Sequence, residues 1–137
     1  MTKNTYHGTC HCGAVAFEAK IDFAKGTTRC NCSICSKSRF WFAVVDPDDF
    51  KVEKGKDRQS DYTWIPPGKS ASHLHYRFCK TCGIRTYAEG NGGKFYAVSI
   101  ATLDDIEEYT DQLAGTLKYQ DGRHDDLTHA PADTRLL

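Results

Sequence analysis

Cysteine is the residue type whose number and spacing in this sequence could do chemistry. The cysteines form three groups: a C-x-C pair, a C-x-C-x-x-C triplet, and a C-x-x-C pair followed by glycine. In that order, the groups are Cys10 and Cys12; Cys30, Cys32 and Cys35; and Cys79 and Cys82. Thiolates at such short spacings are typical zinc ligands, so the sequence predicts metal binding.

The C-x-x-C pair gives the strongest local signal. In "FCKTCG" a tight turn brings the thiolates of Cys79 and Cys82 to one edge of a tetrahedron, and Gly83 lets backbone N–H groups turn toward the sulfurs. A structural zinc ion usually has four protein ligands, and one turn supplies two of them. The other two ligands must therefore come from a distant part of the sequence.

Two divisions of the cysteines can complete this site. In the first, Cys10 and Cys12 join Cys79 and Cys82 in a four-thiolate site, and the triplet holds a second metal ion with one open ligand position. In the second, the C-x-x-C turn uses two cysteines of the triplet and leaves Cys10 and Cys12 without a role. The first division uses every cysteine, and three protein ligands with one open position is the pattern of catalytic zinc. We therefore expect two Zn²⁺ per chain, one structural and one catalytic.

Two other interpretations of the cysteines remain open. Cys79 and Cys82 could form a redox-active pair, although the βαβ pattern of thioredoxin-like proteins is missing. Alternatively, a histidine could complete the triplet and make a second closed structural site. The candidates are His7, His11, His73, His75, His124 and His129.

Length, charge and hydropathy limit the class of protein. A chain of 137 residues fits one domain, spanning 1–137. Lys and Arg number 18, as do Asp and Glu, and this balance argues against a nucleic-acid or anionic-membrane binder. The start of the sequence lacks the apolar segment of a signal peptide, and no apolar run could span a bilayer. A cytoplasmic location, where a reducing environment opposes disulfides, is the expectation.

Strand-like segments dominate the sequence. They are rich in Val, Ile, Phe and Tyr, several alternate with period two, and turn residues separate them. The predicted strands are 14–20, 39–45, 50–54, 61–65, 72–78, 84–89 and 94–101. Only the region after residue 101 has a helical pattern, with Thr102 as the expected N-cap. The sequence thus predicts a mostly β fold of small antiparallel sheets with a short helix near the C-terminus.

Four stretches together carry a resemblance to a known family. They are "GTCHCGAVAFE" (8–18), "CNCSICSKS" (30–38), "FCKTCGIRTY" (78–87) and the weaker "YAVSIATLDD" (96–105). The sequence resembles the glutathione-dependent formaldehyde-activating enzyme (GFA) family, also called the centromere protein V family. The resemblance implies a β-tent fold stapled by zinc. It also implies a structural zinc on the C-x-C and C-x-x-C pairs and a catalytic zinc on Cys30, Cys32 and Cys35.

The reaction that the resemblance implies is a carbon–sulfur lyase type of step. Glutathione adds to formaldehyde and gives S-(hydroxymethyl)glutathione, a hemithioacetal. A thiol that enters the open zinc position would lose its proton, because the metal stabilises thiolate over thiol. Basic residues flank the cysteines and could balance their negative charge or hold a substrate carboxylate. These residues are Arg29, Lys37, Arg39, Lys80 and Arg85.

One segment departs from the family pattern. Near its end the family often has Asp-Gly followed by Asn and Trp. Here Asp121 and Gly122 keep the pattern, whereas Arg123 and His124 depart from it. We therefore expect Arg123 and His124 to bear on the choice of substrate.

Two rival functions belong to other classes. One is a zinc-stapled protein-interaction module without turnover. The other is reduction of methionine sulfoxide, which needs a reactive cysteine outside the metal sites, and the first division of the cysteines leaves none. The open ligand position favours the enzyme over the module.

Overall fold

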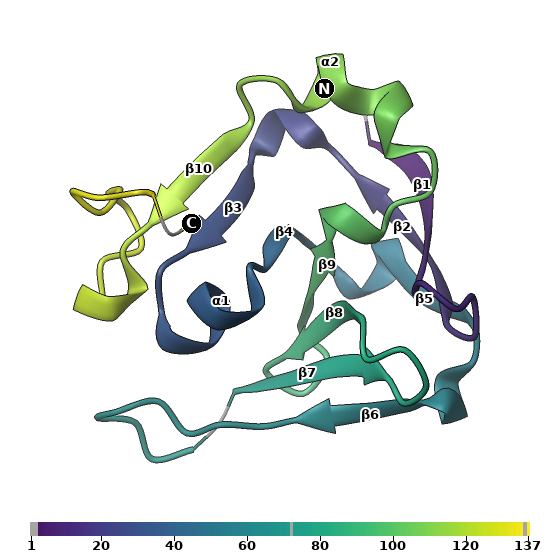
Figure 1. The fold of residues 1–137 in the computed structure, drawn as a ribbon, viewed down its shortest axis with the longest axis horizontal. Helices are drawn as coiled ribbons and strands as arrows, with labels where there is room; N and C mark the ends of the chain where they lie inside the picture. The colour runs from purple at the N-terminus through teal and green to yellow at the C-terminus, as the bar shows by residue number, and fades with distance from the viewer. Residues whose placement is uncertain (1–2, 72, 136) are drawn as a thin grey trace.

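Two β-sheets form the framework of the protein (Figure 1). The structure is a computed structural model and describes residues 3–71, 73–135 and 137. The smaller sheet is antiparallel, with the strand order β1-β2-β5. Its strands are β1 (Asn4–Thr9), β2 (Ala16–Ile21) and β5 (Phe50–Lys54).

The larger sheet has the strand order β10-β3-β4-β9-β8-β7-β6. Its strands are β3 (Thr27–Cys30), β4 (Trp41–Val45), β6 (Gln59–Tyr62), β7 (Leu74–Cys79), β8 (Arg85–Gly90), β9 (Phe95–Ser99) and β10 (Leu117–Gln120). Neighbouring strands run antiparallel except β10 and β3, which are parallel. The parallel pair brings a late segment of the chain beside the strand that ends in Cys30.

Helical segments are short. The α-helices are α1 (Ser33–Ser38) and α2 (Thr110–Leu113). The 3₁₀ turns are η1 (Phe23–Lys25), η2 (Pro47–Asp49), η3 (Lys56–Arg58), η4 (Ile100–Thr102), η5 (Ile106–Tyr109) and η6 (Gly122–His124). None of the helices in the described part of the chain has the length and apolar character that crossing a bilayer requires.

The two sheets pack on each other through a shared apolar core. Phe17 of β2, Val98 of β9 and Ile100 are fully buried in the largest cluster of core residues. Gly8 of β1 lies so close to this core that a Cβ there would be 2.2 Å from Cζ of Phe17. The glycine is therefore needed for β1 to approach β2, and β1 leads directly into the first cysteine pair.

The prediction of a mostly β fold is confirmed, and each of the predicted strands overlaps an observed one. Residue 72 of the predicted strand 72–78 lies outside the described residues. The sequence pattern missed β1, β3 and β10. These strands are short, and in β1 only Tyr6 and Gly8 are buried, so little apolar alternation marks it.

The prediction that Thr102 begins the C-terminal helix was wrong. Thr102 is the last residue of η4, and its hydroxyl donates a hydrogen bond to the carbonyl of Ser99 at 3.0 Å. The following segment instead bonds to β1, since the N–H of Asp104 donates to the carbonyl of His7 at 2.8 Å. The helix α2 begins only at Thr110. Tertiary hydrogen bonds to β1 thus displaced the expected helix start.

Candidate metal centres

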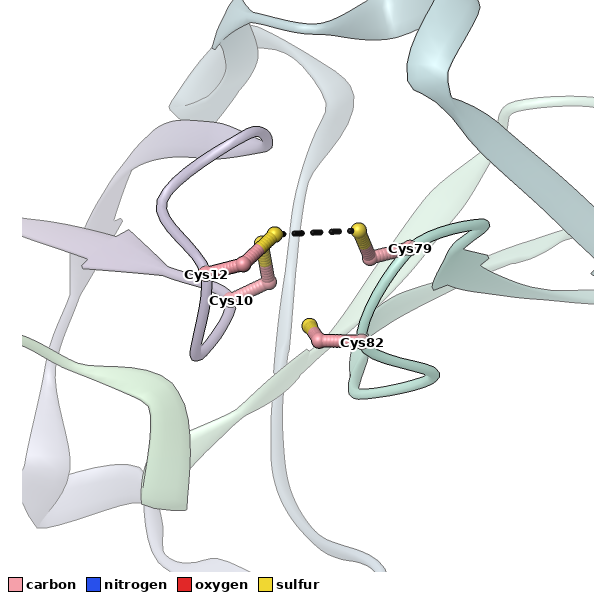
Figure 2. Close-up of side chains that lie close together, drawn as sticks. All are labelled: Cys10, Cys12, Cys79 and Cys82. Atoms are coloured by element: carbon pink, nitrogen blue, oxygen red, sulfur yellow. Dashed lines mark hydrogen bonds between the residues drawn. The ribbon is translucent and has the colours of Figure 1, made fainter.

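The C-x-C and C-x-x-C pairs meet in one cluster, and Figure 2 shows their side chains turned toward one another. Cys10 and Cys12 follow β1, Cys79 ends β7, and Cys82 lies on the turn before β8. The four sulfurs lie within 4.8 Å of one another; Cys10 and Cys12 are 3.7 Å apart and Cys12 and Cys79 3.6 Å. A tetrahedron with Zn–S bonds of about 2.3 Å has sulfurs about 3.8 Å apart. The cluster therefore has the dimensions of a four-thiolate zinc site.

Two similar turns build this cluster. The N–H of Gly13 donates to the carbonyl of Cys10 at 3.1 Å, and the N–H of Gly83 donates to the carbonyl of Cys79 at 2.9 Å. Both glycines have a positive φ, 82° and 76°, which other residues adopt only with strain. The glycine that follows each cysteine pair thus closes the turn that holds the two sulfurs together.

Backbone N–H groups point at several of these sulfurs. The N–H of Val15 donates to Sγ of Cys10 at 3.3 Å, and the N–H of Thr81 donates to Sγ of Cys79 at 3.3 Å. A backbone hydrogen bond from Cys12 is the main cause that lowers the pKa of Cys82 to about 6. Backbone dipoles therefore favour the thiolate, which is the form that binds zinc.

The crowded thiols cannot all ionise without a cation. A backbone hydrogen bond from Ala14 lowers the pKa of Cys12, but burial and the neighbouring thiols outweigh it and raise that pKa to about 11. A bound dication removes this conflict, because it stabilises every coordinating thiolate at once. The donor set fits zinc.

The triplet forms a second cluster, with its sulfurs within 4.8 Å of one another. Cys30 ends β3, Cys32 is the N-cap residue of α1, and Cys35 lies inside α1. The sequence did not predict α1, yet this helix positions Cys32 and Cys35 on the same side, since residues three apart share one face of a helix. Cys30 and Cys35 are buried, and Cys32 is half-buried. Buried sulfurs converging on one point are suited to hold a metal ion.

The electrostatics of the triplet also fit a cation. Hydrogen bonds with the thiols of Cys32 and Cys35 lower the pKa of Cys30. Conversely, the hydrogen bond with Cys30 is the main cause that raises the pKa of Cys35. One sulfur can therefore carry negative charge at the expense of the others, whereas a dication lets all three ionise.

Arg85 is a flanking basic residue whose charge interacts with cysteines of the triplet. Its guanidinium lies 4.6 Å from the ring centroid of Tyr76 and 5.2 Å from that of Phe40, and it donates to the hydroxyl of Ser38 at 2.9 Å. Burial lowers the pKa of Arg85, while the charge of Cys35 opposes that shift. Arg85 can thus balance part of the negative charge of a three-thiolate metal site.

A hollow of about 470 Å³ lies beside α1. Its lining includes Ser33, Ile34, Lys37, Tyr62, Trp64 and Arg85. The lining contains two cations and no carboxylate, so the hollow suits an anionic ligand with an apolar part.

The cysteines thus group four and three, as in the first division. No histidine or carboxylate of the described residues joins the triplet, so a histidine that closes it is not found there. A third group with metal-ligand spacing is His7, Glu18 and Glu53, on the exposed face of the smaller sheet. His7 Nδ1 lies 2.8 Å from Glu53 and Lys51 lies 3.6 Å from Glu18, so ion pairs account for this group.

Fold and site together define a small, mostly β protein with two cysteine clusters that could hold metal ions. A family profile described as glutathione-dependent formaldehyde-activating enzyme matches residues 5–118. The chain belongs to this family. It is also similar to a Rhodobacter sphaeroides protein of known crystal structure, with 28% identity and a TM-score of 0.67. That match covers 83% of this chain and 99% of the other.

Proposed function

We propose that this protein is a zinc-dependent enzyme that adds the thiol of glutathione to formaldehyde and gives S-(hydroxymethyl)glutathione. The observation that carries the proposal is the triplet: three converging thiols, no fourth ligand among the described residues, and a family named for this chemistry. In the reaction a C–S bond forms, and the thiol proton ends on the former carbonyl oxygen. The reverse step makes the enzyme a carbon–sulfur lyase.

The two clusters have different roles in this proposal. Zinc at Cys10, Cys12, Cys79 and Cys82 is structural. At Cys30, Cys32 and Cys35 a bound zinc supplies stabilisation of the substrate thiolate and a fixed place for it beside the aldehyde. Residues 1–137 act as one domain, and the balanced charge argues against nucleic-acid or membrane partners. We also infer a cytoplasmic location, where a reducing environment keeps the thiols free to bind metal.

Residues around α1 suit the rest of the glutathione molecule. Glutathione carries carboxylates, and the hollow beside α1 offers Lys37 and Arg85 without a competing acidic side chain in its lining. No ion pair of either cation occurs among the described residues. Trp64 adds an apolar wall. The protein's own side chains can therefore bind and orient the substrate next to the triplet, which would hold the zinc ion.

The test is a rate measurement with zinc-loaded protein. Exchange between free and hydroxymethylated glutathione can be followed by NMR at equilibrium, with and without protein. The proposal requires exchange faster than the uncatalysed reaction and loss of that acceleration in Cys35→Ser. An exchange rate equal to the uncatalysed one, in protein that contains two zinc ions per chain, would contradict the proposal.

A second candidate function is a protein-interaction module without turnover. Tyr62 and Ile65, near the connection between β6 and β7, are 50% and 56% exposed. An apolar patch that remains in water is typical of a contact with another molecule, and these two side chains would be its candidate centre. The same exchange measurement separates the two functions, because a module gives no acceleration.

A further inference from the structure

Asn31 lies between two cysteines of the triplet. Its backbone carbonyl accepts from the hydroxyl of Ser36 in α1 at 2.9 Å, and its other three polar groups bond to one distant segment. Its backbone N–H donates to the carbonyl of Gln120 at 3.2 Å. Its side-chain amide donates to Oδ1 of Asp121 at 2.8 Å, and its side-chain oxygen accepts from the N–H of Arg123 at 3.0 Å. These bonds join residues about ninety positions apart in the sequence, with separations of 90 and 92 for the two side-chain bonds.

Gly122, in the middle of that segment, touches the triplet. A Cβ at this position would lie 2.5 Å from Sγ of Cys30 and 3.1 Å from Cβ of Cys32. Gly122 is not among the glycines with positive φ, so its backbone conformation does not require glycine. Glycine is needed here because a side chain would prevent this segment from lying against Sγ of Cys30.

Asp121 is held in place from several directions. Its backbone N–H donates to the carbonyl of Asp126 at 2.9 Å, and its carboxylate lies 2.8 Å from Nδ1 of His124. The side chain of Asp121 is only 15% exposed, and the hydrogen bond from Asn31 is the first cause that lowers its pKa. A hydrogen bond to a carboxylate is stronger than one between neutral groups, so the Asn31–Asp121 bond is a firm anchor.

We propose that Asn31 is a positioning residue that fixes the turn η6 against the Cys30 side of the second metal centre. The turn covers Cys30, and we infer that an external thiol approaches from the side of Cys32. Cys30 and Cys35 are 4% and 7% exposed, whereas Cys32 is half-buried, in agreement with this direction of approach. The inference rests on the proposed function in one respect, namely that the triplet holds a metal ion.

Removing the anchor should expose Cys30 and speed the loss of metal from the triplet. Loss of a group that supports a metal ligand typically weakens metal binding by about 10- to 100-fold. We therefore expect Asn31→Ala to release the triplet zinc to a colorimetric chelator about tenfold faster or more, with zinc at the other cluster unaffected. The N–H of Arg123 loses its acceptor in this variant, so its hydrogen exchange should accelerate.

Matched variants separate positioning from general damage. Asp121→Ala removes the same anchor from the other side, whereas Asp121→Asn keeps an oxygen that can accept from Asn31. We expect Asp121→Ala to behave like Asn31→Ala and Asp121→Asn to resemble the wild type. Asp126→Ala is the control, because Asp126 pairs with His129 as Asp121 does with His124, but its side chain has no described bond to the triplet loop.

Zinc counts, release rates and Arg123 exchange decide the outcome. Faster release in both alanine variants, with Asp121→Asn and Asp126→Ala near the wild type, supports the proposal. A folded Asn31→Ala variant that releases zinc at the wild-type rate and shows unchanged hydrogen exchange at Arg123 would overturn it. If Asn31→Ala does not fold, the same measurements on Asp121→Ala decide. Wild-type protein with zinc only at the four-cysteine cluster would overturn the proposed function instead, and Arg123 exchange in Asn31→Ala would still decide whether Asn31 holds the turn.

Discussion

The two cysteine clusters use the same ligand chemistry but connect different parts of the molecule. The four-cysteine cluster joins the end of β1 in the smaller sheet to the β7–β8 turn of the larger sheet, across 67 residues of sequence between Cys12 and Cys79. The triplet joins only β3 to the adjacent α1. A metal in the first cluster would tie two sheets together, whereas one in the second would order a single loop.

This difference teaches that the segments a metal site connects matter as well as the number of its ligands. A zinc ion that ties distant strands would contribute its binding free energy to folding, whereas we expect loss of a zinc ion from the triplet to leave the two sheets joined. The local site is the one that can leave a ligand position to a substrate. The predictions below test this contrast, beginning with the largest expected effect.

Cys79→Ser should give unfolded or insoluble protein. Structural zinc binding is worth about 10–16 kcal/mol in small domains, while a typical net stability is about 5–15 kcal/mol. Loss of this ligand should therefore remove most of the stability. Circular dichroism and thermal melts check the outcome, and a cooperative melt close to that of the wild type would contradict the structural role.

Cys35→Ser should stay folded, lose one of two zinc ions and lose the thiol-dependent activity. The reason is that the triplet connects no distant strands. Elemental analysis, after zinc is added back, should give about two zinc ions per wild-type chain and one per variant chain. A variant that unfolds as Cys79→Ser does would make the triplet structural, and a variant with full activity would remove the triplet from catalysis.

Gly122→Ala and Gly83→Ala should have different effects, because glycine is needed at the two positions for different reasons. A Cβ at Gly122 would be 2.5 Å from Sγ of Cys30, so we expect weaker zinc binding at the triplet by about tenfold or more, with the fold retained. Gly83 has a φ of 76° and nothing within 4 Å of an added Cβ, so Gly83→Ala should cost about 1–2 kcal/mol of stability and keep both zinc ions. Chelator competition and thermal melts measure the two effects. Equal effects of both variants on the triplet zinc would contradict the assignment.

Arg123→Ala and His124→Ala should give the smallest effects. Both side chains extend from the turn beside Cys30, but His124 is 78% exposed, and exposed charge pairs contribute only about 0.2–1 kcal/mol. We expect the apparent affinity for glutathione to change by about fivefold at most, with zinc content intact. Titrations with glutathione check this, and unchanged affinity in both variants would remove these residues from substrate choice.

Much of the site and the fold followed from local pattern. The spacing of Cys79, Cys82 and Gly83 predicted a turn that holds two thiolates, and the structure contains it. Alternating apolar residues located seven of the strands. The pattern failed where few apolar residues mark an element, as in β1, β3 and β10. It also failed at α1, because its sequence "SICSKS" is too short for a helical period to show.

By itself, the sequence determined which residues could bind metal and how each turn presents its sulfurs, because spacings of two or three residues fix local geometry. Only the tertiary structure decided which pairs meet. The Cys12–Cys79 contact and the Asn31–Asp121 bond span 67 and 90 residues, and no local pattern encodes such distances. They depend on how the two sheets bury a common core and on the parallel pairing of β10 with β3, which places Gln120 opposite Cys30. Burial and strand register, rather than a local sequence motif, place residues 121–124 beside the loop that carries Cys30, Cys32 and Cys35.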